Sequence, residues 1–99
     1  DAMWRMLQQP NPADYVIGAE AYSVEPYGIM VRKDDPAFKK VADDAVKALM
    51  KSGEIEKIYS KWFLSPIPPK NINMNVPMST QLKRIMANPT DSPDPAVYQ

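Results

Sequence analysis

The sequence predicts an α/β fold that is rich in helix, and two kinds of pattern predict it. Short runs of β-branched and aromatic residues, centred on residues 15–17 and 27–31, are typical of strands. Longer stretches carry apolar residues at the spacing of helices that bury one face. A chain of 99 residues is long enough for one small domain and too short for two.

The N-terminal third is expected to hold one helix and both strands. The helix is predicted over residues 1–9 and must end before Pro10 and Pro12, because proline cannot continue a helix. The first strand is predicted over residues 14–19 and the second over residues 27–31.

Two helices are expected next. The pair Asp34 and Asp35 is interpreted as a helix cap, with Pro36 in the first helical turn. Gly53 is expected to end this helix in the left-handed region, and a second helix follows over residues 54–63. One face of the first helix is apolar and is expected to be buried; its residues are Phe38, Val41, Ala42, Ala45, Val46 and Leu49.

The C-terminal third differs in composition, since seven of the eleven prolines lie from Pro66 onward. Residues 66–69 are expected to be extended and stiff. A short helix is predicted near residues 79–87 with Ser79 as its cap, and residues 88–99 are expected to be mobile.

The composition excludes several classes of function. The chain has no cysteine and no histidine, which removes thiol and imidazole catalysis and nearly every zinc site. Twelve basic and twelve acidic residues cancel, so we expect no nucleic-acid partner. The adjacent pair Asp43 and Asp44 is interpreted as part of a solvated helix face. No enzyme activity, cofactor or metal site is predicted.

The predicted elements do not make a complete fold. Two strands are not a stable sheet by themselves, yet three apolar helix faces need a surface to cover. We therefore expect the missing strands to come from elsewhere. Unpaired strand edges and exposed helix faces promote association, so the isolated chain is expected to form a homodimer by exchanging strands or helices.

Two runs carry a resemblance to a known family. The segments YGIMVRKDDPAF at residues 27–38 and KSGEIEKIYSKWF at 51–63 are similar to the polar-amino-acid-binding proteins of ABC importers, solute-binding protein family 3. The tail PIPPKNINMN at residues 66–75 resembles the glutamate/aspartate-binding branch. The resemblance implies a periplasmic, non-enzymatic protein that closes two lobes on an amino acid and delivers it to a permease in the inner membrane.

The resemblance also implies a type II periplasmic-binding-protein fold, of which the chain is the C-terminal segment. Residues 1–17 would end lobe 2, and residues 18–22 would form the hinge strand. Residues 23–64 would supply the closing strand and helices of lobe 1, and residues 65–99 a proline-rich tail.

By the same resemblance, Asp1 would accept the α-ammonium group of the ligand in the intact parent protein. The family's other ligand-binding groups lie upstream, so we do not expect this fragment to bind ligand alone. Three alternatives stay open: a receptor input domain, a cyclohexadienyl-dehydratase-like enzyme of the same fold, and an inactive self-associating fragment. The resemblance implies that the hinge residues are Gly18, Ala19, Glu20, Ala21 and Tyr22.

Overall fold

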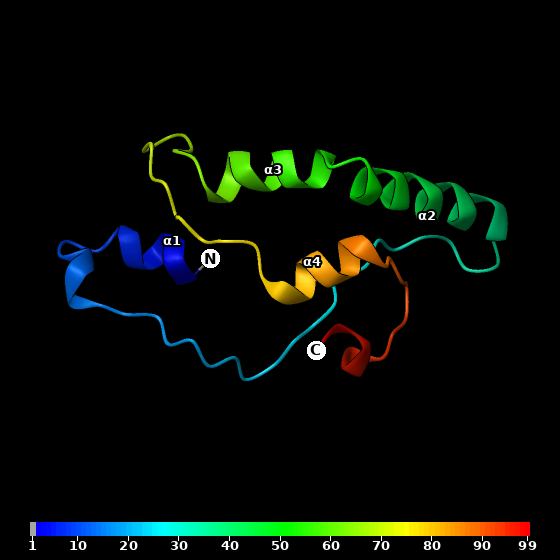
Figure 1. The fold of residues 1–99 in the computed structure, drawn as a ribbon, viewed down its shortest axis with the longest axis horizontal. Helices are drawn as coiled ribbons and strands as arrows, with labels where there is room; N and C mark the ends of the chain where they lie inside the picture. The colour runs from blue at the N-terminus through cyan, green and yellow to red at the C-terminus, as the bar shows by residue number, and fades with distance from the viewer. Residues whose placement is uncertain (1) are drawn as a thin grey trace. The chain divides into compact units, whose positions relative to one another are not determined.

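The computed structural model describes residues 2–99, which form helices joined by extended segments (Figure 1). Their contacts divide into two units. One unit holds the residues up to Ser23 together with Lys57–Pro77, and the other holds Val24–Glu56 and Met78–Gln99. The elements are α1 (Ala2–Leu7), the 3₁₀ helix η1 (Pro12–Asp14), α2 (Pro36–Lys51), α3 (Glu54–Phe63), α4 (Thr80–Ala87) and the 3₁₀ helix η2 (Pro95–Tyr98).

The strands expected over residues 14–19 and 27–31 are not formed within the described chain. Residues 15–18 and 24–32 carry no helix, strand or turn assignment, and Val16 is 91% exposed. The same holds for the predicted hinge strand at 18–22, where the backbone makes only bends. A strand exists only when a neighbour supplies ladder hydrogen bonds, and residues 2–99 supply none to these segments.

The two central helices follow the local sequence signals closely. Asp35 caps α2, since its Oδ1 accepts a hydrogen bond of 3.0 Å from the backbone N–H of Phe38. Asp34 takes no part in the cap and has a φ of 60° in the preceding turn. Gly53 has a φ of 81° between α2 and α3, as a left-handed helix end requires.

The first helix is shorter than the sequence predicts. α1 ends at Leu7, and the N–H groups of Gln8 and Gln9 donate to the carbonyls of Arg5 and Met6, three residues back. Such bonds tighten the last turn of a helix as it ends. The approaching Pro10 therefore stops the helix two residues earlier than expected.

The proline-rich segment reverses direction, so its expected extended form is wrong. The Pro68–Pro69 peptide bond is cis, and the N–H of Ile67 donates to the carbonyl of Ile72 at 3.1 Å. Asn71 inside this turn has a φ of 53°, which asparagine tolerates better than most residues.

The first unit is held together beside this turn by α3. The rings of Tyr59 and Phe63 stack with centroids 4.5 Å apart. The Tyr59 hydroxyl lies 3.1 Å from the carbonyl of Val76, to which it can donate, and the Val76 N–H donates to the carbonyl of Phe63 at 3.1 Å. In the same unit, Lys70 Nζ donates to Gln8 Oε1 at 2.8 Å.

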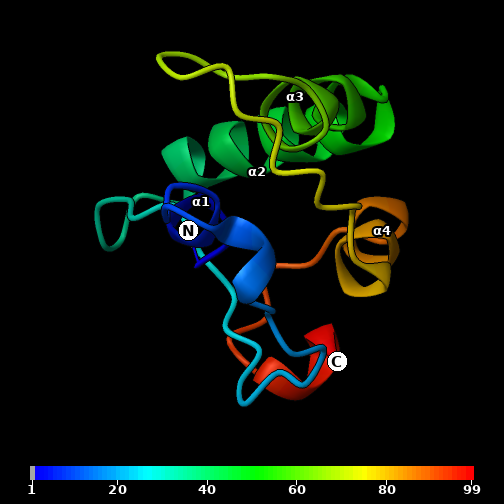
Figure 2. The same cartoon turned by 90° about the vertical axis from the view of Figure 1, so that its left-hand side faces the viewer.

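In the second unit, α4 packs against α2, and η2 packs against α4. Ser79 caps α4 as predicted, since its Oγ accepts from the N–H of Leu82 at 3.1 Å. The chain then turns and ends in η2 (Figure 2). Residues 88–99 therefore have more regular structure than their composition predicts.

The apolar face of α2 is buried only in part. Val46 is half-buried, whereas Phe38 is 57% exposed and Val41 65%. Among the described residues, Met86 in α4 is the buried member of a hydrophobic core, at 7% exposure. The burial that the helical spacing predicts therefore requires more protein surface than residues 2–99 provide.

We expect Gly53→Ala to weaken the junction of α2 and α3. A Cβ at this position would meet no atom within 4 Å, so the cost comes from the positive φ alone, roughly 1 kcal/mol. The matched control is Gly28→Ala, where the added Cβ is equally free and φ is not positive. Circular dichroism should show less helix for Gly53→Ala than for Gly28→Ala, and equal spectra would contradict the assignment.

The pair Lys40–Asp44, joined at 2.5 Å along one face of α2, predicts a pH effect. The hydrogen bond from Lys40 holds the pKa of Asp44 below its ordinary 3.8. Because the folded state favours the charged carboxylate, the pair stabilises α2 above pH 3.8, and this contribution is lost as the pH falls through the lowered pKa. In an NMR titration of the Lys40→Met variant, the pKa of Asp44 should return toward 3.8. An unchanged midpoint would contradict the pairing.

Candidate functional site

Of the predicted site residues, the structure describes the hinge residues alone. Asp1, the predicted ligand contact, lies outside the described residues. The predicted hinge residues are all exposed and belong to no helix or strand, and Tyr22 is 97% exposed. Their hinge role stays a prediction.

A hollow of about 700 Å³ lies wholly in the second unit. This volume is within the range of small-molecule sites. The extended segment 24–31, α2 and α4 form its walls, and residues 89–93 run along it. Its apolar lining includes Val24, Ile29, Ala42, Val46, Leu82 and Tyr98.

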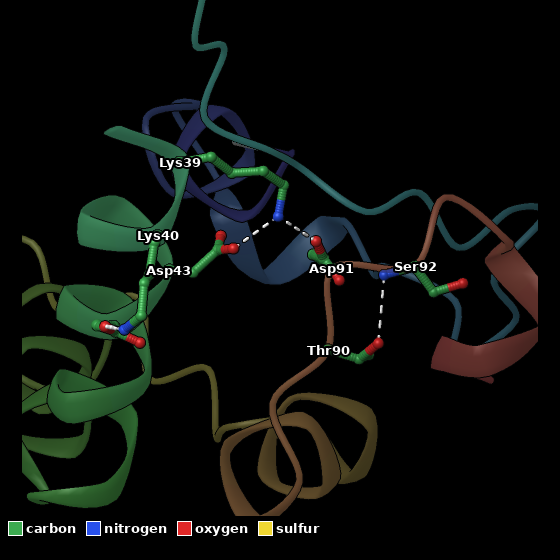
Figure 3. Close-up of polar contacts among 7 residues, drawn as sticks. Lys39, Lys40, Asp43, Thr90, Asp91 and Ser92 are labelled. Atoms are coloured by element: carbon green, nitrogen blue, oxygen red, sulfur yellow. Dashed lines mark hydrogen bonds and ion pairs between the residues drawn. The ribbon is translucent and has the colours of Figure 1, made fainter. Parts of the chain in front are cut away.

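Lys39 at this hollow is bound by two carboxylates (Figure 3). Its Nζ lies 2.6 Å from Asp43 Oδ2 in the same helix and 2.6 Å from Asp91 Oδ2 in the C-terminal tail. The hydrogen bonds to Asp43 and then to Asp91 raise the pKa of Lys39, and the bond from Lys39 lowers the pKa of Asp91. Lys39 and Asp91 are therefore charged at neutral pH, and the Lys39 ammonium already has two carboxylate partners.

The arrangement offers little for chemistry or metal binding. Across residues 2–99, no three acidic side chains come together as a metal ion would need. The interpretation of Asp34 and Asp35 as a cap is confirmed for Asp35, whose carboxylate bonds the α2 backbone. Asp43 and Asp44 each pair with a lysine one turn earlier on a solvated face.

The contact between Lys39 and Asp91 could not be found from the sequence, because the two residues are 52 positions apart. The partners of Lys39 and Lys40 within α2 do carry a signal, since Asp43 and Asp44 follow them at the four-residue spacing of helical ion pairs. None of the helices described is long and apolar enough to cross a membrane.

Comparison with known proteins assigns the chain to a family. The sequence model of the bacterial extracellular solute-binding proteins, family 3, matches residues 5–65, which is more than half of the chain. The match begins after Asp1 and ends at residue 65, where the proline-rich tail begins, and it contains α2, α3 and both predicted strands.

Two relatives with similar sequences are named for acidic amino acids, and a third is named for histidine. The chain is 54% identical over 86 residues to the L-glutamate/L-aspartate-binding protein of Pseudomonas aeruginosa, an alignment that covers 87% of this chain and 28% of the relative. It is 48% identical over 81 residues to the glutamate/aspartate import solute-binding protein of Escherichia coli, an alignment that covers 82% of this chain and 27% of that relative. A probable histidine-binding protein of Neisseria gonorrhoeae is 48% identical over 56 residues, which are 54% of this chain and 20% of that relative.

The chain thus spans between a quarter and a third of the length of its glutamate/aspartate-binding relatives. The family match confirms the prediction made from the YGI and KWF runs, which lie at residues 27–29 and 61–63. The chain belongs to the bacterial extracellular solute-binding proteins, family 3.

Proposed function

We propose that this chain is part of the substrate-binding component of an ABC importer for glutamate and aspartate. The observation that carries the proposal is 54% and 48% identity, over more than four-fifths of the chain, to two proteins named for both acids. The family description adds an extracellular location, which in a bacterium with two membranes is the periplasm. The protein would bind its amino acid there and present it to a permease in the inner membrane.

The lobe assignment belongs to the same proposal. Residues 1–17 would end lobe 2, residues 18–22 would be the returning hinge strand, and residues 23–64 would close lobe 1. The unpaired state of residues 24–32 supports this, since a segment with no ladder of its own can join a sheet that other residues supply. The exposure of Tyr27 and Met30 supports it too, because both side chains are apolar and wholly uncovered.

We also propose that residues 1–99 do not bind the amino acid alone. A bound glutamate needs a cation for its α-carboxylate and an anion for its α-ammonium group. Lys39 and Lys47 both line the hollow of the second unit, and Lys39 is already paired with Asp43 and Asp91. The proposed partner of the ammonium group is Asp1.

Calorimetric titration tests both statements. The full-length protein that contains this chain should give binding heat with L-glutamate and L-aspartate, and the 99-residue chain should give none. Histidine serves as the comparison ligand, because one relative is named for it. A full-length protein that is silent to both acids would overturn the substrate assignment. Heat from the 99-residue chain would overturn the second statement alone.

A matched pair of variants tests Asp1 within the same titration. Asp1→Asn in the full-length protein removes the anionic acceptor and should weaken glutamate binding by about 30-fold or more, as expected for a buried charge left unpaired. Asp14→Asn is the control, since Asp14 is exposed in η1. Equal affinities for the two variants would remove Asp1 from the site.

We further propose that the isolated chain pairs with a second copy by exchanging strands or helices. Large apolar side chains are exposed in each unit taken by itself: Val16 and Tyr22 in the first, Tyr27 and Met30 in the second. A second copy is the simplest source of strand partners for them. Light scattering should give twice the monomer mass, and a monomer that melts in one sharp transition would contradict the exchange.

A further inference from the structure

The C-terminal tail, residues 88–99, forms a small structure of its own beyond the residues that the family model matches. Inside it, the N–H of Ser92 donates to Thr90 Oγ1 at 3.2 Å, and the N–H of Asp94 donates to Ser92 Oγ at 3.2 Å. Asp94 caps η2 by accepting from the N–H of Ala96 at 2.9 Å. These bonds lie within the tail itself.

Two charged contacts attach the tail to helices of the second unit. The Arg84 guanidinium of α4 donates to the carbonyl oxygen of Gln99. Lys39 of α2 donates to Asp91 at 2.6 Å and so joins the tail to a helix 52 residues earlier. Between these attachments the tail runs along the hollow that Ala42, Val46 and Met50 of α2 also line.

Lys39 and Lys40 form a natural comparison in Figure 3. Both are exposed lysines of α2, and each pairs with an aspartate one turn later, Asp43 or Asp44. Lys39 has a second carboxylate from the tail, whereas the bond drawn from Lys40 stays within the helix. The contact with the tail is therefore a property of Lys39 that spacing along the helix does not explain.

We propose that residues 88–99 are a releasable strap, fastened to α2 by Lys39 and Asp91, that closes one side of the hollow lined by α2. Lys39 is 50% exposed and Asp91 70%, so solvent and salt reach the fastening contact. Ion pairs this exposed are weak and are screened by salt. The strap thus opens readily, and opening removes the wall that residues 89–93 give the hollow beside Val46 and Met50, while α2 itself stays folded.

Hydrogen exchange on the full chain tests the strap. Lys39→Met and Asp91→Asn should each speed exchange of the Ala96 and Val97 amides about two- to fivefold, the range expected for one exposed pair. Lys40→Met and Asp44→Asn, which disturb the neighbouring pair, should leave these amides unchanged. Raising the salt concentration should speed exchange in the unaltered chain and have little effect in Lys39→Met.

The double variant Lys39→Met/Asp91→Asn separates the strap from a general loss of structure. If the two residues act through one contact, the double variant should exchange no faster than either single variant. Additive effects, or equal exchange in the Lys39 and Lys40 variants, would overturn the proposal. If Lys39→Met also unfolds α2, the amides of α2 will exchange faster. In that case Asp91→Asn, which leaves the helix sequence intact, decides the outcome.

Discussion

Strand pairing is the constraint on which the rest of this structure depends. Residues 15–18 and 24–32 have the composition of strands, yet no neighbour among residues 2–99 supplies their hydrogen bonds. Without a sheet, the helices have no large flat surface to cover. This explains why α2 exposes Phe38 and Val41 and why burial is concentrated at Met86.

The helices could be predicted because their signals are local. Asp35, Pro36 and Gly53 set the bounds of α2, and Ser79 sets the start of α4, each through backbone groups a few residues away. The prediction of the strands was wrong because strand pairing depends on residues far away in the sequence or outside it. The prediction of an extended segment was wrong at residues 66–69 for a related reason, because composition does not reveal the hydrogen bond from Ile67 to Ile72.

The candidate site divides in the same way. Pairing of Lys39 and Lys40 with aspartates one turn later follows from helical spacing, whereas the bond to Asp91 depends on where the tail returns. The roles predicted for Asp1 and the hinge residues came from resemblance to a family. That family is confirmed for residues 5–65, while the roles of these residues remain predictions. Sequence similarity thus identified the family where the local physics of the chain identified only its helices.

The small core has a thermodynamic consequence. Heat capacity and denaturant sensitivity on unfolding both scale with the surface that becomes newly exposed. Among residues 2–99 the buried core residue is Met86, and Tyr22 and Tyr27 already face water, so this chain has less surface left to expose than a compact domain of its size. Its helices would melt over a broad range of temperature and urea, each according to its own caps and contacts. Joining such a chain to the sheet it lacks would convert several independent helix–coil equilibria into one cooperative transition.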